Sequence, residues 1–401
     1  MPYAEDGEKM KPNNFLEQAK NEKNSYILYF FIYCPLGAVA PLIGQYLSEI
    51  GFSGTQVGAI TSSGTAAAVI AGLIWGRIYA NTYHKKRVIA ILFTGASVFA
   101  LITLRTTDFT LYVLLYAAMY LFQGPVHGLC DSLVMENGRN FPIVRAFGAI
   151  GYSVAVFAAG NFAETYGMKT IFYIYALTFM IAMIALSREN EPPCYKKEED
   201  RDRISLAELL KEKQYVRLLL CSFFVFGCAI GNSTYFGYLF REGGGSIAGI
   251  GLAFLLMAGS EAVFMLLVPA LNKIIPTEKL TLLAVLLCAV RFAFYACGPG
   301  YKILLATFFL QGMSNGIIWV EFIKYFGKLT EPRQYGLAIS TFHAFGNNFS
   351  SIVCGLIGGM ILDGFGARGC YAFFAVWNAL ACVLYLAFGL HRTVKSTDSA
   401  D

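Results

Sequence analysis

Residues 188–213 read RENEPPCYKKEEDRDRISLAELLKEK, the longest polar stretch in a chain of 401 residues. A pair of prolines followed by a run of mixed charge is typical of a linker. On either side of it the sequence returns to long apolar runs, six before it and six after it. We therefore interpret this stretch as the connection between two equivalent halves.

Each apolar run is long enough to cross a bilayer as a helix, which requires about 20 mostly apolar residues. Barrel strands need only about ten residues of alternating polarity, so these longer, continuously apolar runs argue against a barrel. The sequence predicts an all-α integral membrane protein with 12 transmembrane helices in two six-helix halves. The predicted spans lie near residues 25–47, 55–78, 88–105, 110–135, 143–163, 170–187, 215–239, 247–272, 279–298, 303–326, 335–361 and 370–390.

These spans define the expected organisation of the chain. The first 24 residues are polar and lack both an apolar core and a small-residue cleavage site, so we expect a short cytoplasmic tail rather than a cleavable signal peptide. The expected units are a tail, an N-terminal bundle, the linker, a C-terminal bundle and a second tail, at residues 1–24, 25–187, 188–213, 214–391 and 392–401.

The basic residues predict the orientation. Positively charged loops stay on the cytoplasmic side of a membrane. Most of the 31 lysines and arginines fall on the side of the linker. The opposite side carries Arg105, Lys169, Arg241, Lys302 and Arg368. We therefore expect both termini to be cytoplasmic, in a multi-pass protein of the plasma (inner) membrane.

The composition excludes several classes of function. Only 14% of the residues are charged, against about 25% in soluble proteins, so the net charge of +5 does not indicate a nucleic-acid partner. The 10 cysteines include no CxxC pair, and no histidine has metal-ligand spacing. The motifs that bind ATP or redox cofactors are absent as well. We expect neither a metal nor a cofactor, and no enzymatic activity.

Glycine-rich segments open the second and eighth spans. The sequence GFSGTQVG occupies residues 51–58, and GGGSIAG occupies residues 243–249. This weak repeat supports a duplication of the six-span half. Glycine also lets helices approach closely in lipid, so generic helix packing explains the same pattern.

Polar residues inside the spans are functional candidates, because a charge in mid-bilayer costs roughly 2.5–3.5 kcal/mol on insertion scales. In span four, Gln123, His127 and Asp131 recur every four residues and share a stripe of the helix. Arg145 lies about as far after the following turn as Asp131 lies before it. The two should reach similar depth, either as a charged site for a solute or as a structural ion pair.

The second half carries its own deep charges. At about 1.5 Å per helical residue, Glu261 lies roughly 21 Å from the outer end of span eight and Arg291 roughly 18 Å from the cytoplasmic end of span nine. Both are too deep to reach an interface, so we expect a functional role for this pair. Amides and imidazoles on spans ten and eleven suit either a solute site or helix association. They are Gln311, Asn315, His343 and Asn347.

Several of these segments carry a family resemblance. The motif DSL at 131–133, followed by VRAFGAIG at 144–151, resembles the span-four acid and span-five arginine of the lactose-permease and phenylpropionate-permease branch of the major facilitator superfamily. Gly259-Ser260-Glu261 and Val290-Arg291-Phe292 are similar to its span-eight acid and span-nine arginine. The resemblance implies that the first pair binds the solute and that the second takes part in proton coupling.

The resemblance has departures. Gln311 and Ser314 stand where lactose permease carries a histidine and the carboxylate that releases the proton. Asn347 stands in place of its span-eleven lysine. These differences argue against lactose as the solute and leave a different proton route open.

Together these features predict a secondary active transporter, a proton symporter, that works by alternating access. Acids facing a cavity suit hydroxyl donors, so the expected solute is a small polar organic molecule such as a sugar, glycoside or nucleoside. Because arginines equally suit carboxylates, an aromatic carboxylate permease is the alternative, as is an uncoupled facilitator or exporter of the same fold. A multipass membrane enzyme or sensor is a more distant alternative. The expected partners are the solute, protons and the lipid bilayer, with the protein acting as a monomer.

Overall fold

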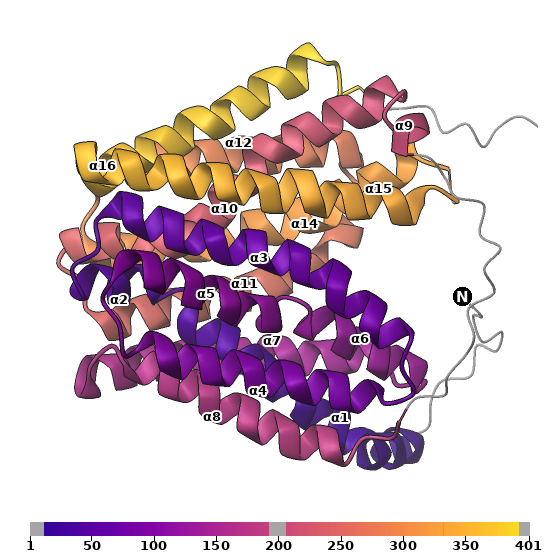
Figure 1. Ribbon diagram of the computed structural model, residues 1–401. Coiled ribbons are helices and arrows are strands. Elements are labelled where there is room, and N and C mark those ends of the chain that lie inside the picture. Colours follow the sequence, from indigo (N-terminus) through magenta and orange to yellow (C-terminus); the bar gives the residue numbers. More distant parts are fainter. Residues whose placement is uncertain (1–11, 192–205, 332, 393–401) are drawn as a thin grey trace, which may run out of the picture.

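The computed structural model describes residues 12–191, 206–331 and 333–392, with side chains from Lys23 onward. All of the regular secondary structure in this part of the chain is helical (Figure 1). Residues 1–11 of the predicted N-terminal tail, residues 192–205 of the linker and residues 393–401 of the C-terminal tail lie outside the described residues.

The first half of the chain forms the lower group of helices in Figure 1. Its first and fourth spans are each built from two consecutive helices, because the chain breaks after Val39 and again at Gly124-Pro125. The helices are α1 (Pro12–Val39), α2 (Ile43–Glu49), α3 (Gly54–Ala80), α4 (Lys85–Thr103), α5 (Phe109–Gln123), α6 (Val126–Glu136), α7 (Phe141–Tyr166) and α8 (Thr170–Ser187).

The second half forms the upper group in Figure 1. A short helix precedes this half, and a π-helical segment interrupts the eleventh span of the chain. The elements are α9 (Leu206–Leu209), α10 (Lys213–Glu242), α11 (Ile247–Leu271), α12 (Thr277–Ala296), α13 (Tyr301–Thr307), α14 (Phe309–Leu329), α15 (Tyr335–Thr341), the π-helix η1 (Phe342–Phe349) and α16 (Ser350–Ala387).

The helices account for the predicted spans. Among the described residues, 10 helices are long and apolar enough to cross a membrane, and α1 and α2 form one more span bent by 41°. The last of the 10 covers 53 residues, Tyr335–Ala387. It reverses direction at Gly366, whose φ of 68° is a conformation that glycine adopts without strain. It therefore contributes two spans, and the predicted all-helical, twelve-span fold class is confirmed.

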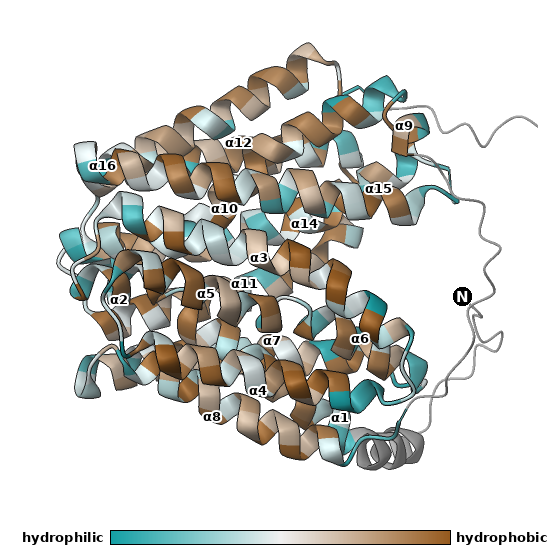
Figure 2. Ribbon diagram, in the orientation of Figure 1, coloured by the Kyte–Doolittle hydropathy of each residue, from teal (hydrophilic) through white to brown (hydrophobic). Residues whose placement is uncertain are grey.

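The outward surface of the bundle suits a lipid environment. Leu73 is 67% exposed, Leu266 is 81% exposed and Val376 is 69% exposed. Apolar residues cover the helices along their length, whereas hydrophilic residues gather at the two ends (Figure 2). Contiguous exposed apolar surface on this scale marks contact with lipid rather than with water. The protein is a multi-pass membrane protein.

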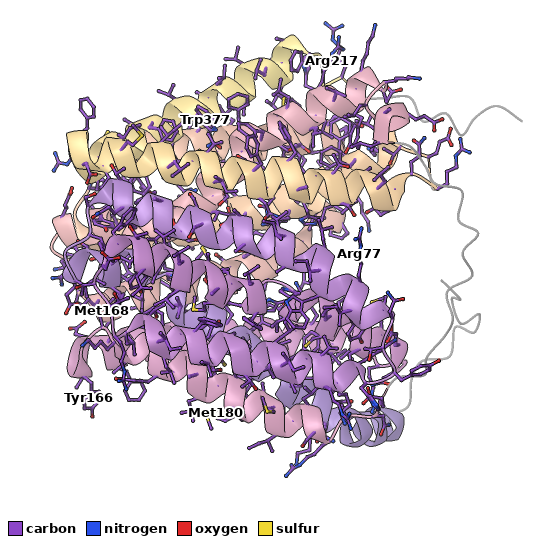
Figure 3. All side chains as sticks on the ribbon, viewed as in Figure 1. Arg77, Tyr166, Met168, Met180, Arg217 and Trp377 are labelled. Carbon is purple, nitrogen blue, oxygen red and sulfur yellow. The ribbon has the colours of Figure 1, made fainter. Side chains whose placement is uncertain are left out.

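The two ends of the bundle differ in how the halves meet. We name them the linker end, where Arg77 and Arg217 lie, and the far end, where Tyr166 and Met168 lie (Figure 3). Between the halves, α3 packs beside α16 and α7 packs beside α11. The hydrogen bonds between described residues of the two halves lie toward the far end. Examples are the Tyr238 hydroxyl to the Gly44 carbonyl at 2.8 Å and the Ser62 hydroxyl to the Ile352 carbonyl at 3.2 Å. The halves are thus closed against each other at the far end.

The predicted orientation can be tested with a native cysteine. Cys297 is exposed at the far end, so a membrane-impermeant maleimide should label the wild-type protein in intact cells, and Cys297→Ser should abolish that labelling. In the Cys297→Ser background, Thr107→Cys at the far end should restore labelling. Lys211→Cys near the linker should be labelled only after the cells are permeabilised. Labelling of Lys211→Cys but not of Thr107→Cys in intact cells would reverse the orientation.

Candidate functional site

Asp131 and Arg145 form an ion pair in the first half. The chain turns back after α6 at Gly138, which has a φ of 67°, so residues at equal distances from the turn meet. Nη1 of Arg145 lies 3.1 Å from both carboxylate oxygens of Asp131. The hydroxyl of Tyr29 on α1 donates to Oδ1 of the same carboxylate at 2.6 Å. Three helices therefore fix the position of this carboxylate.

The ion pair is only partly buried, since the Arg145 side chain is 47% exposed and that of Asp131 is 26% exposed. The guanidinium lies 5.0 Å from the ring centre of Tyr33 on α1, in a cation–π contact. Arg145 begins the second turn of α7, the helix that packs on α11 of the other half. Both charged groups retain hydrogen-bonding capacity that a solute entering between the halves can use.

The other two residues of the predicted stripe have different surroundings. His127 lies beside Tyr33 with ring centres 4.4 Å apart, and its Nε2 has no hydrogen-bond partner in the part of the chain that the structure describes. Gln123 is buried in the first half and accepts a hydrogen bond from Tyr175 of α8 at 2.9 Å. The helix break at Gly124-Pro125 separates the two residues, because proline supplies no N–H to the helical ladder. His127 thus lies beside the Asp131–Arg145 pair, whereas Gln123 lies within the bundle.

Arg291 is the centre of a buried network in the second half. It is 3% exposed, and its Nη1 donates to Oε1 of Gln311 at 2.9 Å. The same oxygen accepts from Asn232 at 2.9 Å, and Asn232 accepts from the hydroxyl of Tyr371 at 2.6 Å. Four helices, α10, α12, α14 and α16, are joined through these side chains.

The charge of Arg291 is not neutralised by a carboxylate within the described residues. Its Nε and Nη2 atoms have no hydrogen-bond partner there. The guanidinium instead lies over the rings of Phe292 and Tyr295, at 4.3 Å and 5.4 Å from their centres. A small cavity that Asn315 and Trp319 also line opens beside it. A buried guanidinium with free donors is costly in a low-dielectric interior, so this site can gain from an acceptor.

Glu261 and Arg291 do not form an ion pair in this conformation. Glu261 on α11 is half-buried and interacts electrostatically with Tyr152 of α7, across the interface between the halves. Its backbone packs tightly against α14, where a Cβ added to Gly316 would lie 2.7 Å from the Glu261 carbonyl oxygen. The carboxylate of Glu261 thus faces the first half, whereas Arg291 is held by Gln311 inside the second.

The π-helix η1 carries the candidate residues of span eleven. The ring of His343 stacks on that of Trp319 with centres 5.9 Å apart. Asn347 donates weakly to Asn348 at 3.4 Å, and its own Oδ1 has no partner among the described residues. Segments of π-helix inside membrane helices occur frequently at functional sites. The side chains of His343 and Asn347 can therefore form further hydrogen bonds, for example with a solute. The same holds for Asn315, which lies beside Arg291.

Sequence reasoning missed the aromatic part of the site. Tyr29 and Tyr33 recur four residues apart in the first span, a helical spacing that could have placed both on one face toward Asp131. Tyr152 lies seven residues after Arg145 and therefore on the same face of α7. Trp319 follows Asn315 by four residues. Tyr152 and Trp319 thus each lie one or two helical turns from a predicted polar residue, whereas the first span contains no predicted site residue.

Two six-helix halves that pack together at one end and contain charged side chains have the organisation expected of a membrane transporter. Comparisons with known proteins agree. Residues 24–373 match the MFS_1 like family, and the chain belongs to this family of major facilitator transporters.

Two relatives in sequence are permeases. The maltose permease of Geobacillus stearothermophilus is 30% identical over 367 residues, covering 90% of this chain and 92% of the relative. The nucleoside permease NupG of Escherichia coli is 21% identical over 392 residues, covering 90% and 93%. A crystal structure of the nucleoside transporter NupG superimposes with a TM-score of 0.81 at 20% identity, covering 93% of this chain and 99% of that one. That structural likeness concerns the fold.

Proposed function

We propose that the protein is a secondary active transporter, a proton symporter, that moves a sugar, glycoside or nucleoside by alternating access. The observation that carries this proposal is the partly exposed Asp131–Arg145 pair, whose carboxylate also accepts a hydrogen bond from Tyr29. The resemblance of this pair to the sugar-binding acid and arginine of the lactose-permease branch supports the assignment. Maltose and nucleosides, the solutes named for two relatives, share a hydroxylated sugar ring.

The two halves offer complementary groups to such a solute. The Asp131 carboxylate accepts hydrogen bonds from ring hydroxyls, and the Arg145 guanidinium donates to ring oxygens. His127 and Tyr33 flank that pair. From the second half, Asn315, His343 and Asn347 supply amide and imidazole groups, and Trp319 supplies an aromatic face on which a sugar or a base can stack. Gln311 contributes indirectly, because its side chain accepts a hydrogen bond from Arg291 and thereby positions the guanidinium.

The orientation follows from the distribution of lysine and arginine. With the linker end in the cytoplasm of a cell with a plasma (inner) membrane, the closed far end faces outward, and the described conformation is inward-facing. The organisation proposed is two six-helix bundles, at residues 25–187 and 214–391, with both tails and the 188–213 linker cytoplasmic. A single chain contains both halves, and we propose a monomer as the transporting unit.

One observation favours a different solute class. The buried guanidinium of Arg291 has free donors and no carboxylate partner among the described residues, which would suit an aromatic carboxylate. The Arg145 charge, in contrast, is already neutralised by Asp131. Because the exposed pair carries no net charge, a neutral hydroxylated solute fits better. An uncoupled facilitator or exporter would use the same site.

Proton coupling requires a group in the membrane that alternates between charged and neutral forms. Arginine cannot do this, because it stays protonated in proteins. Asp131 is already engaged in an ion pair with Arg145. Glu261 has no ion-pair partner within the described residues and lies at the moving interface beside Tyr152. We propose Glu261 as the proton carrier, with Arg291 as the partner that it approaches during the cycle.

The solute site predicts specific losses of binding. Asp131→Asn and Arg145→Lys should each weaken solute binding about 10- to 100-fold, because a hydrogen bond to a charged group contributes about 1.5–3 kcal/mol. The lysine variant tests geometry, since a point charge cannot replace a planar guanidinium. Gln123→Leu is the control, because it should lower the melting temperature while leaving the binding constant unchanged. If both site variants merely unfold, and a double neutral variant restores transport, then the pair is structural.

The coupling assignment predicts a separation of two activities. Glu261→Gln should retain exchange of solute across the membrane at near the wild-type rate and should lose accumulation driven by a pH gradient. Proteoliposomes loaded with solute allow both measurements on one preparation. A Glu261→Gln variant that still accumulates solute in response to the pH gradient would show that another group carries the proton.

A further inference from the structure

From contacts at the far end we infer that Asp363 and Glu164 hold the outer side closed by capping helices of the opposite half, and that they set the balance between the two access states. The inference rests on the proposed alternating access, and it concerns residues remote from the solute site.

Asp363 lies on α16, near the far end of the second half. Its Oδ1 accepts a hydrogen bond from the backbone N–H of Gly54 at 2.5 Å. Its Oδ2 accepts from the N–H of Thr55 at 2.7 Å and from the hydroxyl of Thr55 at 2.6 Å. Gly54 and Thr55 are the first two residues of α3, in the first half. The first N–H groups of a helix have no partner within the helix, so an acid from one half satisfies the helix start of the other.

Glu164 makes the corresponding contact with the halves exchanged. It lies near the far end of α7, in the first half, and its Oε2 accepts from the N–H of Ala248 at 2.6 Å. Ala248 is the second residue of α11, in the second half. Both acids therefore place a negative charge at the positive end of a helix that belongs to the opposite half, where the helix dipole stabilises it.

The local arrangement around the two helix starts is also the same. Ser53 precedes α3 and caps the N–H of Gln56, and Ser246 precedes α11 and caps the N–H of Gly249. In each case the serine accepts from the N–H of the third helical residue. The acid from the opposite half accepts from the first two N–H groups of α3 and from the second N–H group of α11. The fifth and second spans repeat as the eleventh and eighth, so the two contacts are related by the duplication of the halves.

Close backbone packing continues inward from each contact. A Cβ added to Gly58 of α3 would clash with the carbonyl oxygen of Gly355 on α16. A Cβ added to Gly160 of α7 would lie 3.1 Å from the Cα of Gly251 on α11. The acids therefore lie at the outer rim of two tight seams. Opening the far end must separate both seams, which breaks both acid contacts and returns the helix starts to water.

Removal of these acids should therefore favour far-end opening. Asp363→Ala and Glu164→Ala should each increase far-end accessibility about fivefold, and the double variant should increase it further. Asp108→Ala is the matched control. Asp108 also caps a helix start at the far end, at Leu111 of α5 with a distance of 2.8 Å, but it acts within its own half. Asp108→Ala should leave the accessibility unchanged.

The accessibility is measured with a cysteine in a seam. Ser62 of α3 is 6% exposed and bonded to the opposite half at Ile352. Ser62→Cys, in a background with Cys297→Ser, reports opening through its rate of reaction with a membrane-impermeant maleimide in intact cells. The assay needs no solute, so its result does not depend on the solute class or on coupling to protons. Asp363→Asn, which keeps an acceptor oxygen, should fall between the wild type and Asp363→Ala and shows that the effect is not a failure to fold.

Two outcomes would overturn the inference. The first is a Ser62→Cys labelling rate that is the same with and without the two acids, in variants that express and melt like the wild type. The second is an increase in Asp108→Ala that equals the increase in Asp363→Ala, which would indicate general loosening of the far end.

Discussion

A bilayer offers no hydrogen-bond partner to the protein inside it, and this constraint determines most of the structure. Backbone groups must be satisfied within helices, which is why the described residues cross the membrane only as helices. Buried charges must find partners from neighbouring helices. Asp131 accepts hydrogen bonds from Arg145 and Tyr29. Arg291 donates a hydrogen bond to Gln311 and lies over aromatic rings. At the far end, the free helix starts of one half are satisfied by acids of the other.

The same constraint explains which features could be predicted from the sequence. The spans could be predicted because each membrane-crossing segment must by itself contain about 20 mostly apolar residues. The Asp131–Arg145 contact was predictable because a short turn fixes the relative depth of two neighbouring helices. The electrostatic interaction of Glu261 with Tyr152 was not predictable, since it depends on how α11 and α7 face each other across the two halves. That rotation follows from packing of the whole bundle rather than from residue spacing.

Local irregularities account for the remaining differences. Gln123 is separated from His127 and Asp131, the other residues of the predicted stripe, because the fourth span breaks at Pro125. His343 and Asn347 lie in a π-helix, whose i→i+5 bonding alters the four-residue spacing assumed for an α-helix. The roles proposed for all these residues, from solute binding to proton coupling, rest on the geometry of the described conformation. In that conformation the far end is closed by contacts between the halves.

A thermal-shift screen would test the proposal that the site around Asp131 and Arg145 binds a hydroxylated, sugar-containing solute. Purified wild-type protein would be heated with a panel of sugars, glycosides, nucleosides and aromatic carboxylates. A ligand present at about 100 times its Kd stabilises the folded protein by about 2.7 kcal/mol, which raises the melting temperature measurably. We expect such a rise with at least one sugar, glycoside or nucleoside. A rise with an aromatic carboxylate, and with none of the hydroxylated solutes, would contradict it.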